Sequence, residues 1–147
     1  MDKGASIIDI GGGNSLLVDA LIELGFTDLS VLDISGKALE QAQKRLGDRA
    51  KYIHWLESDI LDFNPTKNYT LWHDRASFHF LTVSRDIKKY TEIVTQSKAK
   101  HLVIGTFSTS GPEKCSGLLV TQYDCKKLKN CFIYRSYITY SVIIIFF

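Results

Sequence analysis

Residues 6–15 read SIIDIGGGNS, a short apolar run that ends in three consecutive glycines. The apolar run of residues 6–10 predicts a buried strand. Residues 15–24 follow as a predicted helix, on which Asp19 and Glu23 form a single polar stripe. Glycines at the junction let the backbone turn tightly and approach a ligand with no Cβ in the way. The helix start exposes free N–H groups, so this segment predicts a ligand site.

The rest of the chain alternates short apolar runs with helical periodicity. Ser35 is expected to cap a second helix, which ends at Gly47, and Ser84 to cap a third over residues 85–97. The remaining strands are predicted at residues 29–32, 51–55, 69–72 and 101–107. This order predicts an α/β fold: a doubly wound, mostly parallel, Rossmann-like sheet with helices on both faces. Residues 118–123 and 132–147 look extended, which predicts antiparallel strands near the C-terminus.

The composition is that of a globular protein, with 45% hydrophobic and 23% charged residues. A net charge of +2 does not indicate a nucleic-acid partner. Three cysteines without a C-x-x-C spacing and the lack of a signal peptide favour a cytoplasmic protein. The apolar stretch 142–147 is too short to cross a membrane. The four histidines show no metal-site spacing, so no metal is expected.

Acidic residues follow the second and third predicted strands. Asp33 comes twenty residues after Gly13, where a carboxylate can accept hydrogen bonds from ribose hydroxyls. Asp59 follows the third strand and is placed to accept an adenine amino group, with Ile60 against the ring. These acids predict a nucleoside at the carboxyl edge of the sheet. In the alternative interpretation, Asp33 and Asp59 only cap turns.

Two nucleoside cofactors fit such an edge. The dinucleotide fingerprint G-x-G-x-x-G fails, because the sixth position counted from Gly11 is Leu16. S-adenosylmethionine sites instead carry an acid two residues before the first glycine, which Asp9 supplies. This carboxylate suits the ammonium group of a methionine moiety, directly or through water, and would repel a pyrophosphate. We therefore expect S-adenosylmethionine, with a nicotinamide-dependent oxidoreductase as the less favoured alternative. The predicted cofactor-binding residues are Asp9, Gly11, Gly12, Gly13, Asp33, Ile34, Asp59 and Ile60.

With these motifs the chain resembles class I S-adenosylmethionine-dependent methyltransferases. It also resembles a narrower bacterial and mitochondrial group that includes the citrate-synthase lysine methyltransferase. The matching segments are IDIGGG (8–13), VLDIS (31–35), AL (38–39), WHDRASFHFLT (72–82), IGTF (104–107) and GPEKCSGL (111–118). The resemblance implies a cofactor-binding methyltransferase domain over residues 1–124. Residues 125–147 are expected to form an atypical tail, as edge strands of the same sheet.

The resemblance also implies methyl transfer to a protein lysine or a small molecule, and leaves the acceptor and the oligomeric state open. Transfer is a direct displacement at a sulfonium carbon, so alignment of donor and acceptor matters most. Asp74 stands where this fold places acceptor-side residues, Arg75 suits an acidic substrate group, and His79 suits a base for an amine. In the alternative, Arg75 pairs with Asp74, and His79 is a core histidine bonded to the backbone.

Two departures from the family affect the expected activity. Its members usually carry several tens of residues before the first strand, whereas Met1 lies five residues before Ser6. They also end in an ordered hairpin, which the tail from Cys125 does not resemble. We therefore expect a truncated chain that binds the cofactor weakly and turns over slowly. The extreme alternative is an inactive cofactor-binding remnant.

Overall fold

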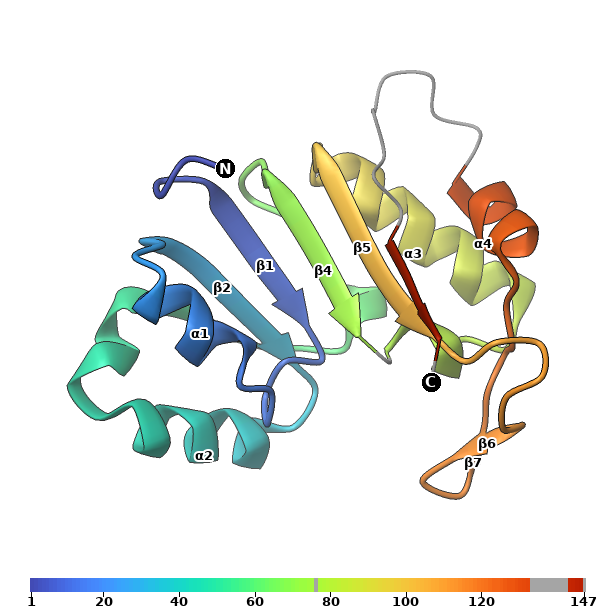
Figure 1. Cartoon of the computed structure of the whole chain (residues 1–147), viewed down its shortest axis with the longest axis horizontal. Helices are drawn as coiled ribbons and strands as arrows, with labels where there is room; N and C mark the ends of the chain where they lie inside the picture. Colours follow the sequence, from blue (N-terminus) through green and yellow to red (C-terminus); the bar gives the residue numbers. More distant parts are fainter. Residues whose placement is uncertain (76, 133–142, 147) are drawn as a thin grey trace.

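The computed structural model describes residues 1–75, 77–132 and, as backbone, 143–146 (Figure 1). The strands are β1 Ser6–Ile10, β2 Asp28–Asp33, β3 Ile53–Glu57, β4 Leu71–Arg75, β5 His101–Thr106, β6 Lys114–Cys115, β7 Leu118–Leu119 and β8 Ile143–Phe146. The α-helices are α1 Leu17–Glu23, α2 Gly36–Leu46, α3 Ser84–Gln96 and α4 Cys125–Phe132. Short 3₁₀ helices are η1 Gly47–Tyr52, η2 Ile60–Asp62 and η3 Phe78–Phe80.

The main sheet has the strand order β3-β2-β1-β4-β5-β8, and every pairing in it is parallel. The chain winds from β1 outward to β3, then returns to the other side of β1 and continues through β4 to β5. This reversal makes the carboxyl ends of β1 and β4 the switch point, where ligands bind in doubly wound sheets. The predicted fold class is confirmed.

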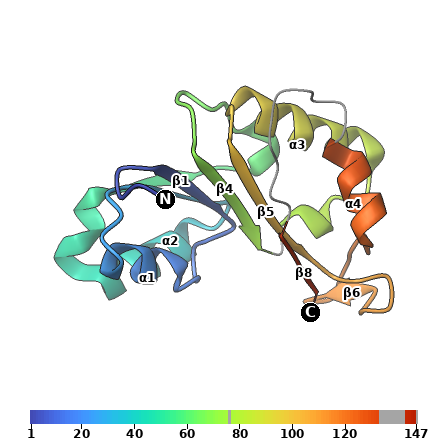
Figure 2. The same ribbon diagram turned by 45° about the horizontal axis from the view of Figure 1, so that its top comes forward.

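Helices cover both faces of the sheet (Figures 1 and 2). On one face, α1 and α2 pack over Ile7, Leu29 and Val31. On the other face, α3 and α4 pack over strand residues that include Ile8 and Leu102. Successive strand residues point to opposite faces, so burial on both faces explains why these strands read as nearly continuous apolar runs.

The two expected helix caps have different outcomes. The Ser35 hydroxyl accepts a hydrogen bond from the Ala38 N–H at 3.2 Å, and α2 ends at Gly47 with φ of +58°. Both predictions about α2 are confirmed. The predicted Ser84 cap is wrong, because Ser84 is already the first helical residue of α3. The preceding residue, Val83, provides the carbonyl that accepts from the Asp86 and Ile87 N–H groups.

The last part of the chain differs from the expected antiparallel completion of the sheet. β8 runs parallel to β5, and the antiparallel pairing occurs in the separate β6–β7 hairpin. Residues 125–132 form α4, whose side chains Leu128 and Phe132 are buried one helical turn apart. A helix between two strands is a crossover connection, which gives parallel strands. The rest of the extended stretch predicted over residues 133–142 lies outside the described residues.

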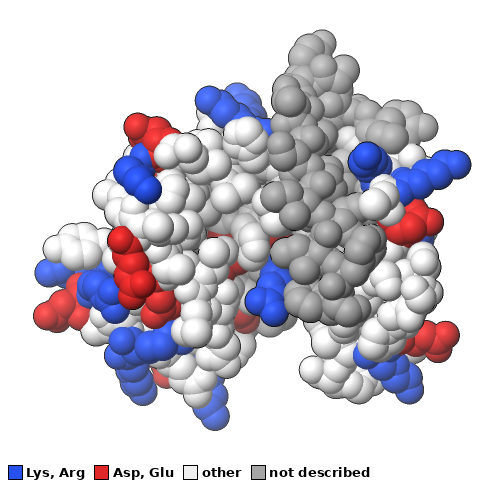
Figure 3. All heavy atoms as spheres, viewed as in Figure 1, with Lys and Arg blue, Asp and Glu red and all other residues white. Residues whose placement is uncertain are grey.

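The described surface carries charges of both signs. Lys and Arg side chains lie among Asp and Glu side chains over α1 and α2 on the face shown in Figure 3. Over residues 1–75, 77–132 and 143–146, no helix combines the length and apolar character needed to cross a membrane.

The packing of α4 predicts a large effect of truncating Leu128, which is fully buried among the residues over the α3 face. We expect Leu128→Ala to lower the free energy of unfolding by about 2–5 kcal/mol, because it removes buried methyl groups and leaves a cavity. Lys129→Ala, on the exposed side of the same helix, is the matched control. Urea unfolding measures both, and equal stability of the two variants would show that α4 is not part of the core.

Candidate functional site

The glycine turn is hydrogen-bonded to the end of β2. The N–H groups of Gly11 and Gly12 both donate to the Leu32 carbonyl, at 2.7 and 3.3 Å. Gly11 has φ of +68°, in the region that favours glycine. The three glycines also have no room for a side chain. Added Cβ atoms on Gly11, Gly12 and Gly13 would overlap, respectively, Ser77 Oγ, the Asp9 carboxylate, and Ala38 with Asp33.

Asp33 joins three elements at this edge. Its Oδ2 accepts from the Gly13 N–H at 2.9 Å, and its Oδ1 accepts from the Ser35 N–H at 2.8 Å. Asp33 therefore does cap these turns, as the alternative interpretation expected. Each carboxylate oxygen can accept more than one hydrogen bond, so capping leaves acceptor capacity for a ribose hydroxyl. Binding of ribose by Asp33 stays a prediction.

The other predicted nucleoside residues lie near the ends of β2 and β3. Asp59 is exposed, and its Oδ1 accepts from the Leu61 N–H at 2.8 Å, which caps η2. Ile60 is partly buried against the core on the α3 face. Ile34 follows Asp33 and is 69% exposed, so its apolar side chain is free to contact a ligand. The predicted adenine contacts of these residues stay predictions.

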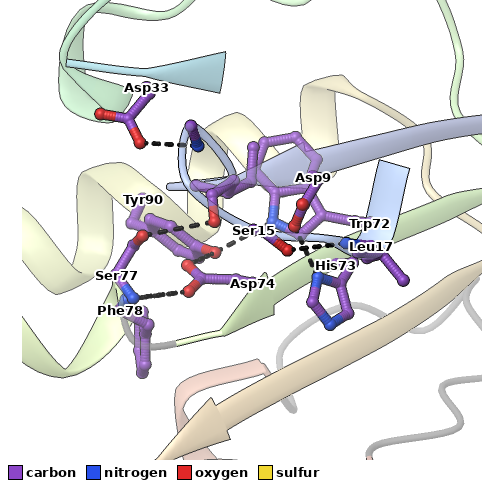
Figure 4. Close-up of polar contacts among 12 residues, drawn as sticks. Asp9, Ser15, Leu17, Asp33, Trp72, His73, Asp74, Ser77, Phe78 and Tyr90 are labelled. Atoms are coloured by element: carbon purple, nitrogen blue, oxygen red, sulfur yellow. Dashed lines mark hydrogen bonds and ion pairs between the residues drawn. The ribbon is translucent and has the colours of Figure 1, made fainter. Parts of the chain in front are cut away.

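Asp9 is 3% exposed and pairs with a residue that the sequence did not single out (Figure 4). Its Oδ1 lies 2.7 Å from His73 Nδ1, on the neighbouring strand β4. Its Oδ2 is buried and has no hydrogen-bond partner within the described part of the chain. No spacing rule identifies such a pair, because the two residues meet only through the register of β1 with β4.

Asp74 is fully buried, and both its carboxylate oxygens are occupied (Figure 4). Oδ1 accepts from the N–H groups of Ser77 and Phe78, at 2.8 and 3.2 Å, and Oδ2 accepts from the Tyr90 hydroxyl at 2.6 Å. The Tyr90 oxygen accepts in turn from the Trp72 indole N–H at 2.9 Å. Burial raises the pKa of Asp74 to about 6, against the lowering effect of these hydrogen bonds.

The other two predicted catalytic residues lie in different surroundings. Arg75 is exposed and, as the next residue along β4, faces the opposite side from Asp74. His79 is fully buried and stacks on Phe107, with ring centroids 4.9 Å apart. Burial lowers the pKa of His79, which favours the neutral ring. The alternative of a core histidine is right about burial, but neither ring nitrogen has a hydrogen-bond partner among the described residues.

The structure thus brings Asp9, Asp33 and the three glycines together, and adds His73 and Ser77 to them. A separate apolar cavity of about 330 Å³ lies at the amino ends of β2 and β3, the opposite edge of the sheet, and is lined by residues such as Phe26, Leu29 and Tyr52. It contains no predicted site residue. In the described ranges, no group of three or more His, Cys, Asp or Glu side chains is placed to hold a metal ion.

Comparisons with known proteins locate this fold among methyltransferases. No family model and no curated protein matches the sequence. The structure is similar to an S-adenosylmethionine-dependent methyltransferase from Mesorhizobium loti, with a TM-score of 0.73 and 17% identity over 89% of this chain and 73% of that one.

Two further solved structures are similar over smaller shares of their own length. The 1,6-didemethyltoxoflavin-N1-methyltransferase of Burkholderia thailandensis, solved with bound S-adenosylhomocysteine, gives a TM-score of 0.69 at 13% identity, over 88% of this chain and 59% of that one. An S-adenosylmethionine-dependent methyltransferase from Clostridium acetobutylicum gives a TM-score of 0.55 at 22% identity, over 63% of this chain and 37% of that one. The chain therefore has the fold of these enzymes and spans less than two thirds of the latter two.

The buried Asp74 carboxyl predicts an unusual pH dependence of stability. Its pKa of about 6 in the folded chain exceeds the ordinary value of 3.8, so the folded state takes up a proton first as the pH falls. Lowering the pH from 7.5 to 5.0 should therefore stabilise the wild-type chain, relative to Asp74→Asn, by about 1.4 kcal/mol. Chemical denaturation at both pH values measures this difference. Identical pH profiles for the two proteins would contradict it.

Proposed function

We propose that this chain binds S-adenosylmethionine at the carboxyl edge of its sheet and transfers the methyl group to an acceptor. The observation that carries the proposal is the Asp9 Oδ2 atom, a buried acceptor with no partner among the described residues, beside Gly12. A buried carboxylate oxygen is costly unless a donor reaches it. The ammonium group of a methionine moiety is such a donor, whereas the pyrophosphate of a dinucleotide would be repelled.

The nucleoside part of the cofactor extends from the glycine turn toward β2 and β3. Asp33 accepts from the ribose hydroxyls, and Ile34, Asp59 and Ile60 contact the adenine. The missing Cβ atoms of the glycine turn let the backbone approach the ligand. The Burkholderia enzyme of the same fold, solved with S-adenosylhomocysteine, supports this choice of cofactor.

Asp74, Arg75 and His79, on and after β4, have different tasks in methyl transfer. Methyl transfer needs alignment and no covalent nucleophile. Arg75, which is exposed at the carboxyl end of β4, contacts the acceptor. Asp74 positions the turn at Ser77 and Phe78, because its carboxylate holds both N–H groups. His79 is the candidate base for an amine acceptor, a role that requires access to its buried ring.

The acceptor is a protein lysine or a small molecule. The resemblance to the citrate-synthase lysine methyltransferase group favours the lysine, and its two longest matching segments are residues 72–82 and 111–118. The first segment runs through β4 and η3, and the second leads into the β6–β7 hairpin. Mass spectrometry of citrate synthase and of small amines, each incubated with the chain and S-adenosylmethionine, separates these acceptors. Cofactor binding without transfer to any acceptor would favour an inactive cofactor-binding protein.

Cofactor choice predicts which ligand stabilises the chain. S-adenosylhomocysteine should raise the melting temperature, because a ligand that binds only the folded state adds RT ln(1 + [L]/Kd) to its stability. NAD at the same concentration should leave the melting temperature unchanged. Differential scanning fluorimetry measures both ligands side by side. A shift with NAD alone would overturn the proposal in favour of a nicotinamide-dependent enzyme.

The proposed ribose contact predicts the effect of truncating Asp33. Asp33→Ala should weaken S-adenosylhomocysteine binding by about 1.5–3 kcal/mol, the usual contribution of a hydrogen bond to a charged group. Titration calorimetry is run below the melting temperature of the variant, since the change also removes the bonds to Gly13 and Ser35. Asp48→Ala, at an exposed acid in η1, is the matched control. Unchanged affinity with a lowered melting temperature would make Asp33 a turn cap only.

A further inference from the structure

His73 and Asp9 form a pair across the two central strands. The backbone register places Asp9 of β1 directly opposite His73 of β4. Their side chains meet with Nδ1 2.7 Å from Oδ1 (Figure 4). An ionised carboxylate only accepts hydrogen bonds, so Nδ1 carries the hydrogen. The second ring nitrogen, Nε2, therefore gains a proton only when the imidazole becomes a cation.

This contact decides which way the Asp9 carboxylate faces. With Oδ1 held by His73, Oδ2 is the atom that a Cβ on Gly12 would overlap. Oδ2 thus borders the glycine turn, and it is buried without a partner among the described residues. Rotation of the carboxylate would break the bond to His73, which is the only hydrogen bond of the Asp9 side chain within the described part of the chain.

From this geometry we infer that His73 is a positioning residue, which holds Asp9 Oδ2 toward the cofactor ammonium group and weakens ammonium binding when it is protonated. The inference rests on the proposed function. With neutral His73, the pair carries one negative charge, which attracts the ammonium. With protonated His73, the pair has no net charge. Proton uptake by His73 and ammonium binding therefore oppose each other, and the coupling between them is reciprocal.

Other ionisable groups lie near this pair and must be separated from it. Arg75 of β4 and His101 of β5 are on the same face of the sheet, by strand alternation. Asp74 points to the opposite face, where Tyr90 and backbone N–H groups hold it. On α1, the Asp19 carboxylate is bound by Arg45 of α2. Asp74, with a pKa of about 6, also changes charge over the pH range of the test, but it is retained in His73→Asn, so a pH dependence that comes from Asp74 would persist in that variant. His101 is the other histidine on this face and needs its own control.

Titration calorimetry between pH 5.5 and 7.5 tests the inference with two ligands. S-adenosylhomocysteine carries the ammonium group, and 5′-methylthioadenosine has the same nucleoside without the amino-acid part. For the wild-type chain, the affinity for S-adenosylhomocysteine should fall about tenfold from pH 7.5 to 5.5. The affinity for 5′-methylthioadenosine should stay constant over this range.

Substitutions at His73 separate its two tasks. His73→Asn keeps a donor at the position of Nδ1 but does not titrate, so it should bind S-adenosylhomocysteine with the same affinity at both pH values. His73→Leu removes the donor and should weaken S-adenosylhomocysteine binding at least about fivefold at pH 7.5, with no change for 5′-methylthioadenosine. Retained binding of 5′-methylthioadenosine shows that each variant is folded. His101→Asn should keep the wild-type pH profile.

The outcomes distinguish this inference from the proposed function. If His73→Asn shows the same pH dependence as the wild type, or His73→Leu binds S-adenosylhomocysteine normally, the role of His73 is wrong and the cofactor assignment stands. If neither ligand binds the wild-type chain, the proposed function and the inference both fail.

Discussion

The tight fit of the glycine turn among three side chains is the constraint on which the site depends. Asp9, Asp33 and Ser77 each occupy the space that a Cβ on one of the glycines would need. They come from β1, from the end of β2 and from the turn after β4. The strand order β2-β1-β4 is what brings them to one place. The shape of the turn is therefore set by its neighbours, and a side chain on any of the three glycines would displace one of them.

The buried carboxylates of Asp74 and Asp9, on neighbouring strands, differ in how many of their oxygens are paired. Asp74 has both oxygens paired with protein donors, so its charge is used to hold the Ser77–Phe78 turn. Asp9 has one oxygen paired and the other without a partner in the described part of the chain. A fully paired buried carboxyl is a structural element, whereas a half-paired one beside a turn is a place where a donor from a ligand gains most.

The core on the α3 face holds the turn after β4 in place. The Trp72 indole, the Tyr90 hydroxyl and the Asp74 carboxylate form a chain of hydrogen bonds from α3 to the turn after β4. Phe78, within that turn, packs on Tyr90 and on Phe132 of α4. Ser77, its neighbour, lies against Gly11. A binding edge built on packed strands and helices is held more precisely than one carried on free loops.

Local sequence patterns were sufficient for the strand–turn–helix of residues 6–24, for the Ser35 cap and for the doubly wound order, because periodicity and capping act over a few residues. The candidate acids Asp9 and Asp33 followed from the same spacing. Ser84 resembled a cap equally well, yet α3 already begins at Ser84, and Val83 is the residue that precedes the helix.

Only the tertiary structure decided the parallel direction of β8, the saturation of Asp74 and the pairing of Asp9 with His73. Asp9 and His73 are 64 positions apart in the chain. They meet because β1 and β4 pair in one register, and that register depends on how the whole sheet buries its apolar residues on both faces, which no local pattern encodes.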